Sequence, residues 1–204
     1  MTPRNLGNRL LVATHNQGKL EEIAQLLKPF GVACVSAGDM NLPEPDETGT
    51  TFVENARIKA HAAAKATGLP ALADDSGIEV DALDKAPGIY TADWAESDQG
   101  RDFQMAMGKT HRMLIERKAE QPWTARFCCT LVLAWPDGSD AVFPGVMEGQ
   151  VVWPMRGSQG HGYDPIFQPK GFELTFGEMD RWEKNQISHR ADAFNKFVAE
   201  YFDG

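Results

Sequence analysis

The strongest constraint on the fold is a pair of neighbouring segments with the composition of two long β-strands. Residues Trp123–Trp135 (WTARFCCTLVLAW) are rich in apolar, aromatic and β-branched side chains, which favour a strand. Pro136-Asp137-Gly138 follows and is typical of a turn. A partner strand is predicted over Ala141–Val152. We therefore expect a central antiparallel hairpin.

Around this hairpin, the sequence alternates between strand-like and helix-like segments. Thr51 and Glu54 form a T-x-x-E capping box that opens a helix ending near Thr67, and Asn41–Thr50 before it is a loop rich in turn residues and acids. The other predicted strands are 9–14, 32–35, 71–74 and 78–83, and the other predicted helices are 18–29, 102–120 and one beginning at Ser188. This order predicts a mixed α/β fold.

Length and charge narrow the classes of protein that the chain can belong to. The 204 residues suit one large domain or two closely joined lobes, and we take 1–204 as a single domain. A formal net charge of -9 argues against nucleic acid as a partner. Cys34, Cys128 and Cys129 match neither a disulfide framework nor a zinc site, which favours a reduced, cytoplasmic protein. The apolar stretch 10–13 is too short for a membrane span, so no membrane partner is expected.

Polar residues at the end of the first predicted strand form the first candidate site. Thr14-His15-Asn16-Gln17-Gly18-Lys19 connects that strand to the first predicted helix. A helix N-terminus offers free N–H groups to a phosphate, and Lys19 adds a full positive charge. The alternative is an ordinary strand-to-helix loop.

Carboxylates form the second candidate site. Asp74 and Asp75 follow a predicted strand, and Ser76-Gly77 is expected to turn the chain after them. Adjacent carboxylates repel each other unless a cation or hydrogen bonds compensate, and Mg²⁺ prefers such oxygen ligands. Glu47, in the acidic loop, is the third carboxylate. The alternative interpretation of Asp-Asp-Ser-Gly is a solvated turn.

Three further groups carry polar chemistry. Asn55 and Lys59 lie four residues apart, hence on one face of the capped helix. They form either a clamp for phosphate or an ordinary solvated polar stripe. The glycines of Gly160–Pro165 (GHGYDP) would let a backbone approach a flat ligand, unless the segment is only a turn. Lys184 precedes Ser188-His189-Arg190, in which Ser188 is a good N-cap. The helix dipole disfavours the cations His189 and Arg190 in the first turn that would follow, which favours a functional role over a purely structural one.

Together these motifs closely resemble the inosine/xanthosine triphosphate pyrophosphatase family, which hydrolyses deaminated purine nucleotides. The matching strings, in family order, are THNQGK at 14–19, ETGTTFVENARIKA at 47–60, LADDSG at 72–77, APGIY at 86–90, GHGYDPIF at 160–167 and EKNQISHR at 183–190. They span nearly the whole chain. The resemblance implies an elongated mixed sheet with flanking helices that form two lobes around a central cleft, and a homodimer.

The resemblance also implies an activity and a role for each matching residue. The expected reaction is Mg²⁺-dependent hydrolysis of ITP, dITP and XTP to the nucleoside monophosphate and pyrophosphate. Asp75 is the candidate catalytic residue, and the expected metal ligands are Glu47, Asp74 and Asp75. The residues expected to bind the substrate are Thr14, Asn16, Lys19, Lys59, Ser76, His161, Gly162, Tyr163, Asp164, Lys184, Ser188, His189 and Arg190.

This chain departs from the family pattern at two positions. His161 stands where family members usually carry phenylalanine, and Asp93 stands where many carry arginine. Two other classes of function compete with the expected one. The first is a pyrophosphatase for modified pyrimidine or ordinary nucleotides on a related fold. The second is a nucleotide sensor without catalysis or a nucleic-acid-binding module. A turnover assay with ITP and Mg²⁺ separates an enzyme from a sensor.

Overall fold

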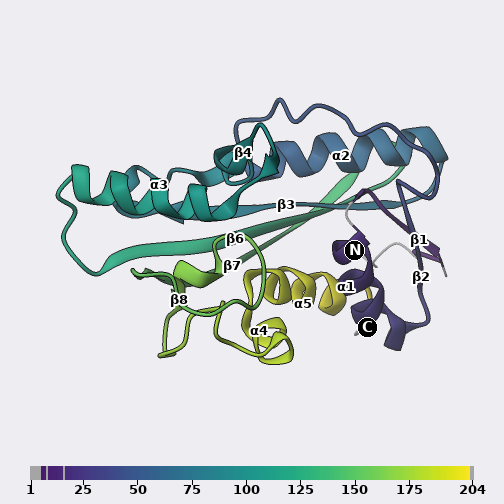
Figure 1. The fold of residues 1–204 in the computed structure, drawn as a ribbon. Helices are drawn as coiled ribbons and strands as arrows, with labels where there is room; N and C mark the ends of the chain where they lie inside the picture. Colours follow the sequence, from purple (N-terminus) through teal and green to yellow (C-terminus); the bar gives the residue numbers. More distant parts are fainter. Residues whose placement is uncertain (1–5, 8, 16, 203–204) are drawn as a thin grey trace. The chain divides into compact units, whose positions relative to one another are not determined.

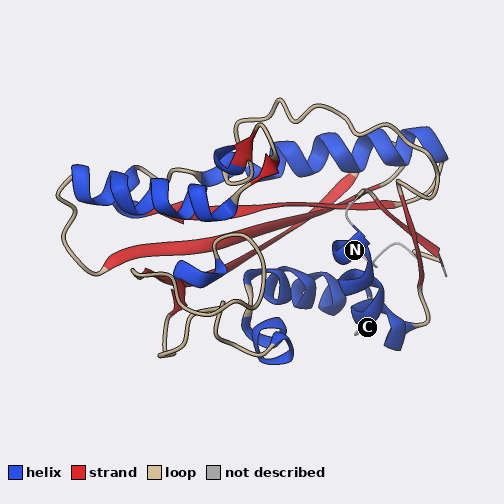
Figure 2. Ribbon diagram, viewed as in Figure 1, coloured by secondary structure: helices blue, strands red, loops and turns tan. Residues whose placement is uncertain are grey.

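The computed structural model describes residues 6–7, 9–15 and 17–202, and it has the mixed α/β fold that the sequence predicts (Figures 1 and 2). Six strands form the main sheet in the order β2-β1-β3-β6-β7-β8. These strands are β1 (Arg9–Val12), β2 (Ala33–Ser36), β3 (Ala71–Val80), β6 (Trp123–Ala134), β7 (Asp140–Val151) and β8 (Phe167–Pro169). The predicted hairpin is present as β6 and β7, which neighbour each other and are joined by the short turn 135–139.

The helices match the predicted helical segments, with one addition. They are α1 (Gln17–Leu27), α2 (Phe52–Thr67), α3 (Phe103–Glu116), α4 (Arg181–Ile187) and α5 (His189–Tyr201). Two short strands, β4 (Glu96–Ser97) and β5 (Gly100–Arg101), form a separate antiparallel ladder. The 3-10 segments are η1 (Lys28–Phe30), η2 (Asp81–Leu83), η3 (Gly88–Tyr90), η4 (Asp93–Ala95) and η5 (Asp164–Ile166). The sequence did not predict α4, which is short and buries none of its residues.

The chain divides into two compact units, each built from separate stretches of sequence. The first unit comprises Met1–Asp75, Thr130–Pro144 and Ala193–Gly204, and the second comprises Ser76–Cys129 and Gly145–Asp192. The single domain over 1–204 and the cleft between two lobes therefore stay predictions.

Helix α2 supplies much of the core of the first unit. Its buried alanines Ala56, Ala60 and Ala63 recur at helical spacing and pack with Leu11 of β1 and Val132 of β6. Strand β1 pairs in parallel with both β2 and β3. The N-terminus of α2 is capped as predicted, because the Thr51 hydroxyl accepts a hydrogen bond from the amide of Glu54. Small alanine side chains let this helix lie close to the strands.

The core of the second unit is richer in large side chains. Leu114 of α3 is buried in the same cluster as Phe127 of β6 and Phe167 of β8. The rings of Phe127 and Phe167 meet edge to face, with centroids 4.6 Å apart. Asp102 caps α3 by accepting a hydrogen bond from the amide of Met105. Tyr163, one of the candidate site residues, is buried in this core.

One prediction about the backbone is wrong. The residues Ser76-Gly77 predict a turn between two short strands, but β3 runs without interruption from Ala71 to Val80. The burial of the strand decides this, since Asp74, Asp75 and Ile78 are all buried within it. A strand covered on both faces tolerates a serine and a glycine that would signal a turn on the surface. The two aspartates therefore lie inside a strand and not at its end.

Among the described residues, no helix has the length and apolar character needed to cross a membrane.

Candidate active site

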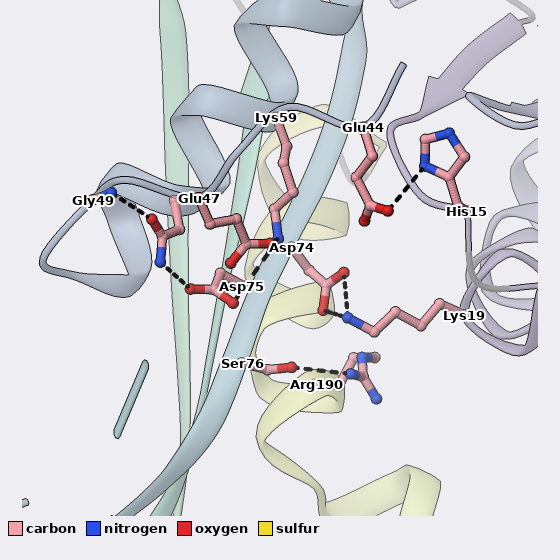
Figure 3. A network of polar contacts seen from close by, with 11 residues as sticks. His15, Lys19, Glu44, Glu47, Gly49, Lys59, Asp74, Asp75, Ser76 and Arg190 are labelled. Atoms are coloured by element: carbon pink, nitrogen blue, oxygen red, sulfur yellow. Dashed lines mark hydrogen bonds and ion pairs between the residues drawn. The ribbon is translucent and has the colours of Figure 1, made fainter. Parts of the chain in front are cut away.

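Asp75 lies at the centre of a cluster of charged and polar side chains in the first unit (Figure 3). Its side chain is largely buried and points from β3 towards α2. The Asn55 side-chain amide donates a hydrogen bond to Asp75 Oδ2 at 3.2 Å, and Lys59 Nζ lies 3.9 Å from Asp75 Oδ1. Lys59 Nζ also donates to Glu47 Oε1 at 2.7 Å. One face of α2 therefore links the acidic loop to β3, in agreement with the predicted spacing of Asn55 and Lys59.

Burial and charge perturb the titration of this cluster. Burial raises the pKa of Asp75 to about 6, although the positive charge of Lys59 acts in the opposite direction. For Lys59, burial alone would lower the pKa, but the carboxylates of Asp74, Asp75 and Glu47 outweigh burial and raise it. Lys59 thus stays charged. A carboxylate with a pKa near neutrality can exchange protons at the pH of the cell.

Asp74 forms a second ion pair in the first unit. Lys19 Nζ, from α1, donates to Asp74 Oδ1 at 3.1 Å and to Oδ2 at 2.9 Å. The Asp74 side chain is only 5% exposed, whereas that of Lys19 is 30% exposed. Lys19 is therefore accessible to a ligand from solvent, while its carboxylate partner is buried. Two adjacent aspartates thus contact two different lysines.

The remaining residues of the motif at 14–19 precede Lys19 in the sequence. Thr14 follows β1, and its amide donates to the carbonyl of Val12 at 2.8 Å. Asn16 lies outside the described residues. His15 Nε2 is 2.8 Å from the carbonyl oxygen of Leu42. A cavity of about 110 Å³ in the first unit is lined by both His15 and Lys59.

The described residues hold no preformed group of three or more His, Cys, Asp or Glu side chains arranged around a metal position. The donor chemistry nevertheless suits a hard divalent cation, because Glu47 and Asp75 present carboxylate oxygens to the same lysine. The Glu47 side chain is 37% exposed, so a divalent cation from solvent can reach it. Such a cation would then replace Lys59 as the partner of this carboxylate. Magnesium binding by Glu47, Asp74 and Asp75 stays a prediction.

In the second unit, Asp164 is the buried residue that organises the GHGYDP segment. Its side chain is 2% exposed and forms an ion pair with Lys184 of α4. Asp164 Oδ2 also accepts a hydrogen bond from the amide of His161 at 2.6 Å. Gly160 has a positive φ of 77°, and a Cβ there would collide with the Asp164 carboxylate. Asp164 thus holds both the loop and Lys184 in place.

Two aromatic residues of this unit, Phe127 and Phe176, contact predicted site residues but were not themselves predicted from the sequence. The ring of His189 stacks on Phe127, with centroids 4.8 Å apart and planes inclined by 13°. Lys184 Nζ lies 5.3 Å from the ring centroid of Phe176. Phe127 lies in β6, and its sequence context is that of an ordinary core residue. Its contact with His189 cannot be inferred from either local sequence.

The other predicted residues of the second unit occupy distinct environments. Ser188 is buried and its hydroxyl accepts a hydrogen bond from the amide of Ala191 at 3.2 Å, as expected of an N-cap. Arg190 Nη2 donates to Ser76 Oγ at 3.4 Å (Figure 3). Tyr163 is 1% exposed in the core, and Gly162 beside it has a φ of 62°. The His161 side chain is exposed.

Curated proteins that resemble this chain share most of its length. It is 66% identical over 198 residues to a dITP/XTP pyrophosphatase of Ruegeria pomeroyi, a match that covers 97% of each chain. It is 57% identical over 207 residues to a dITP/XTP pyrophosphatase of Agrobacterium fabrum, covering 96% of this chain and 97% of that one.

Solved structures resemble it in fold as well as in sequence. A HAM1 protein from Coxiella burnetii superimposes with a TM-score of 0.89 and 36% identity, covering 95% of this chain and 98% of that one. A nucleoside-triphosphatase, dITP/XTP pyrophosphatase, from Mycobacterium abscessus gives a TM-score of 0.77 at 36% identity, with coverage of 93% and 98%. The sequence profile of the Ham1 family matches residues 10–200. The chain therefore belongs to the Ham1 family.

Proposed function

We propose that this protein hydrolyses ITP, dITP and XTP to the nucleoside monophosphate and pyrophosphate, and so removes deaminated purines from the nucleotide pool. The observation that carries the proposal is the cluster around Asp75, where a buried carboxylate lies beside Lys59 and Glu47. Relatives more than half identical to this chain are named dITP/XTP pyrophosphatases. A cluster of this chemistry suits a phosphoanhydride substrate.

The cations of the first unit match the phosphate part of such a substrate. A nucleoside triphosphate carries about four negative charges near neutral pH, and these must be neutralised before a nucleophile can approach. Lys19 and Lys59 supply positive charge, with Thr14 and Asn16 as further phosphate ligands. Bound Mg²⁺, held by Glu47 and Asp75 with Asp74 close by, would supply additional charge neutralisation at the phosphates.

Asp75 is the proposed general base. Its pKa of about 6, raised by burial, leaves it largely ionised at neutral pH while keeping it basic enough to accept a proton from water. Asn55 and Lys59 each contact one of its oxygens, which orients the carboxylate. Asp75 then takes the proton of the attacking water as the α–β bond is cleaved.

The second unit supplies the proposed contacts to the base. Hypoxanthine and xanthine present a hydrogen-bond acceptor at O6, whereas adenine presents an amino donor. Lys184 and His189 can donate to O6, and the same donors would be left unpaired against adenine, which can cost up to about 10⁴-fold in rate. The other proposed contacts in this unit are Ser76, His161, Gly162, Tyr163, Asp164, Ser188 and Arg190.

We further propose that the protein is a cytoplasmic homodimer.

Product analysis tests the proposal directly. Purified protein, ITP and Mg²⁺ should yield IMP and pyrophosphate, and inorganic phosphate should appear only after a separate inorganic pyrophosphatase is added. Asp75→Asn is the matched control for contaminating activity. Release of IDP and phosphate would contradict the assignment, and a panel with ATP, GTP and modified pyrimidine nucleotides would reveal a different substrate class. Binding of ITP without turnover would instead indicate a sensor.

A further inference from the structure

Asn55 connects two parts of the first unit through a single side chain. It lies in the first turns of α2 and is only 3% exposed. Its Oδ1 accepts a hydrogen bond from the amide of Gly49 at 2.8 Å, and its Nδ2 donates to Asp75 Oδ2 at 3.2 Å. Gly49 is two residues from Glu47 in the acidic loop. One buried carboxamide therefore contacts both the loop that carries Glu47 and the carboxylate of Asp75.

The two contacts require different chemistry at the two ends of the side chain. Gly49 offers a donor and Asp75 offers an acceptor, so the residue between them must present one acceptor and one donor. An aspartate at this position would lack the donor, and an alanine would lack both groups. Because the site is buried, a missing partner is not replaced by solvent and is costly.

The loop backbone approaches α2 very closely at this point. A Cβ on Gly49 would lie 2.6 Å from Asn55 Oδ1 and 2.6 Å from the Cβ of Glu54. The amide and hydroxyl of Thr50 both donate to the Glu54 carboxylate, at 2.7 and 2.8 Å. The segment next to Glu47 is thus fixed to the first turn of the helix by several contacts, and the side chain of Asn55 continues from this segment to Asp75.

We propose that Asn55 is a positioning residue that fastens the Glu47 loop to Asp75, so that the two carboxylates are held together beside Lys59. Lys59 lies one turn further along α2 and contacts the same two carboxylates, 2.7 Å from Glu47 and 3.9 Å from Asp75. Asn55 therefore fixes the spacing of the two carboxylates that Lys59 contacts and that a bound divalent cation would use. This inference rests on the proposed function for its effect on turnover, but its structural part does not.

Two substitutions separate the two contacts of Asn55. Asn55→Asp keeps the acceptor for the Gly49 amide and places a second carboxylate against Asp75, whereas Asn55→Ala removes both contacts. Turnover of ITP should fall about 10- to 100-fold in both variants, as for a partner that orients a metal ligand, mainly in kcat and with KM changed less than about 3-fold. Lys65→Ala, exposed on the same helix, is the matched control and should leave both constants unchanged.

Hydrogen exchange and metal binding provide readouts that do not depend on turnover. Exchange of the Gly49 amide, measured by NMR on the metal-free protein, should accelerate at least about 10-fold in Asn55→Ala and remain slow in Asn55→Asp, because only the alanine variant lacks the acceptor. The dissociation constant for Mn²⁺, measured by calorimetry without nucleotide, should rise about 10-fold or more in Asn55→Ala.

A double variant tests the contact with Asp75 by reversal. Asn55→Asp combined with Asp75→Asn restores one donor and one acceptor between the two side chains. Its melting temperature should therefore exceed that of Asn55→Asp by more than Asp75→Asn alone raises the melting temperature of the unmodified protein. Unchanged Gly49 exchange in Asn55→Ala, full turnover in Asn55→Asp or no recovery beyond the gain from Asp75→Asn alone would each overturn the proposal. If the unmodified protein does not hydrolyse ITP, the proposed function fails, while the exchange, Mn²⁺ and melting experiments still decide the role of Asn55.

Discussion

Lys59 in the first unit contacts Glu47 and lies near Asp75, whereas Lys184 in the second unit is paired with Asp164 and lies over the Phe176 ring. The first arrangement brings carboxylates together and concentrates negative charge, which a divalent cation can offset. The second balances one charge with another among aromatic rings. The difference lies in the charge balance: two carboxylates share one lysine in the first cluster, whereas one carboxylate is paired with one lysine in the second, and this contrast is why we propose the first for metal and phosphates and the second for the base.

The largest expected effect comes from breaking the balanced pair. Lys184→Met would leave Asp164, 2% exposed, as an uncompensated buried carboxylate. We expect a loss of about 3–5 kcal/mol in the free energy of unfolding, measured by urea denaturation. Adding Asp164→Asn should recover part of this loss, because the buried charge is then gone. Lys65→Met, at an exposed position, is the control, and an equal loss there would refute the balanced pair.

Removing the charge of Asp75 should affect turnover most. Asp75→Asn keeps the shape of the side chain but removes its basicity and its negative charge, so kcat for ITP should fall at least about 10²-fold at saturating Mg²⁺. The exposed Asp98→Asn serves as the control and should retain full activity. Activity close to that of the unmodified protein would exclude Asp75 both as the base and as a metal ligand.

The same substitution should increase stability when metal is absent. Burial raises the pKa of Asp75 from 3.8 to about 6, so the folded protein binds this proton more tightly than the unfolded chain, and stability from this group falls as pH rises from about 4 to about 6. Above pH 6 the cost is complete, at roughly 2–3 kcal/mol for a shift of about two units. In EDTA, Asp75→Asn should therefore be more stable at pH 8, and the gain should vanish near pH 4. A gain that does not depend on pH would contradict this account.

The smallest expected effect concerns His161, where the chain departs from its family. The exposed imidazole sits between Gly160 and Gly162, and its backbone amide is held by Asp164. If the ring stacks on the purine, His161→Ala should raise KM for ITP roughly 10-fold, given about 1–3 kcal/mol for an aromatic stacked on a base. His161→Phe should keep or improve KM and flatten the pH dependence between about pH 5.5 and 7.5. An unchanged KM in the alanine variant would remove His161 from the base pocket.

Local patterns predicted most of the elements because each depends on neighbouring residues. The apolar, aromatic and β-branched composition of Trp123–Trp135 predicted β6, and the capping box at Thr51 predicted the start of α2. Helix α4 was not predicted, because its seven residues include no buried side chain and therefore show no hydrophobic periodicity. The turn at Ser76-Gly77 was a wrong prediction, since burial on both faces of β3 overrides a local turn signal.

The sequence by itself determined the mixed α/β class, the capped helix with Asn55 and Lys59 on one face, and the residue types that could bind phosphate and metal. It determined these because helix caps, strand periodicity and side-chain chemistry act over a few residues. Only the tertiary structure decided that Lys19 pairs with Asp74, 55 residues away, that Asn55 joins Gly49 to Asp75, and that His189 stacks on Phe127. These contacts depend on how distant segments pack, and the burial that packing creates is what raises the pKa of Asp75.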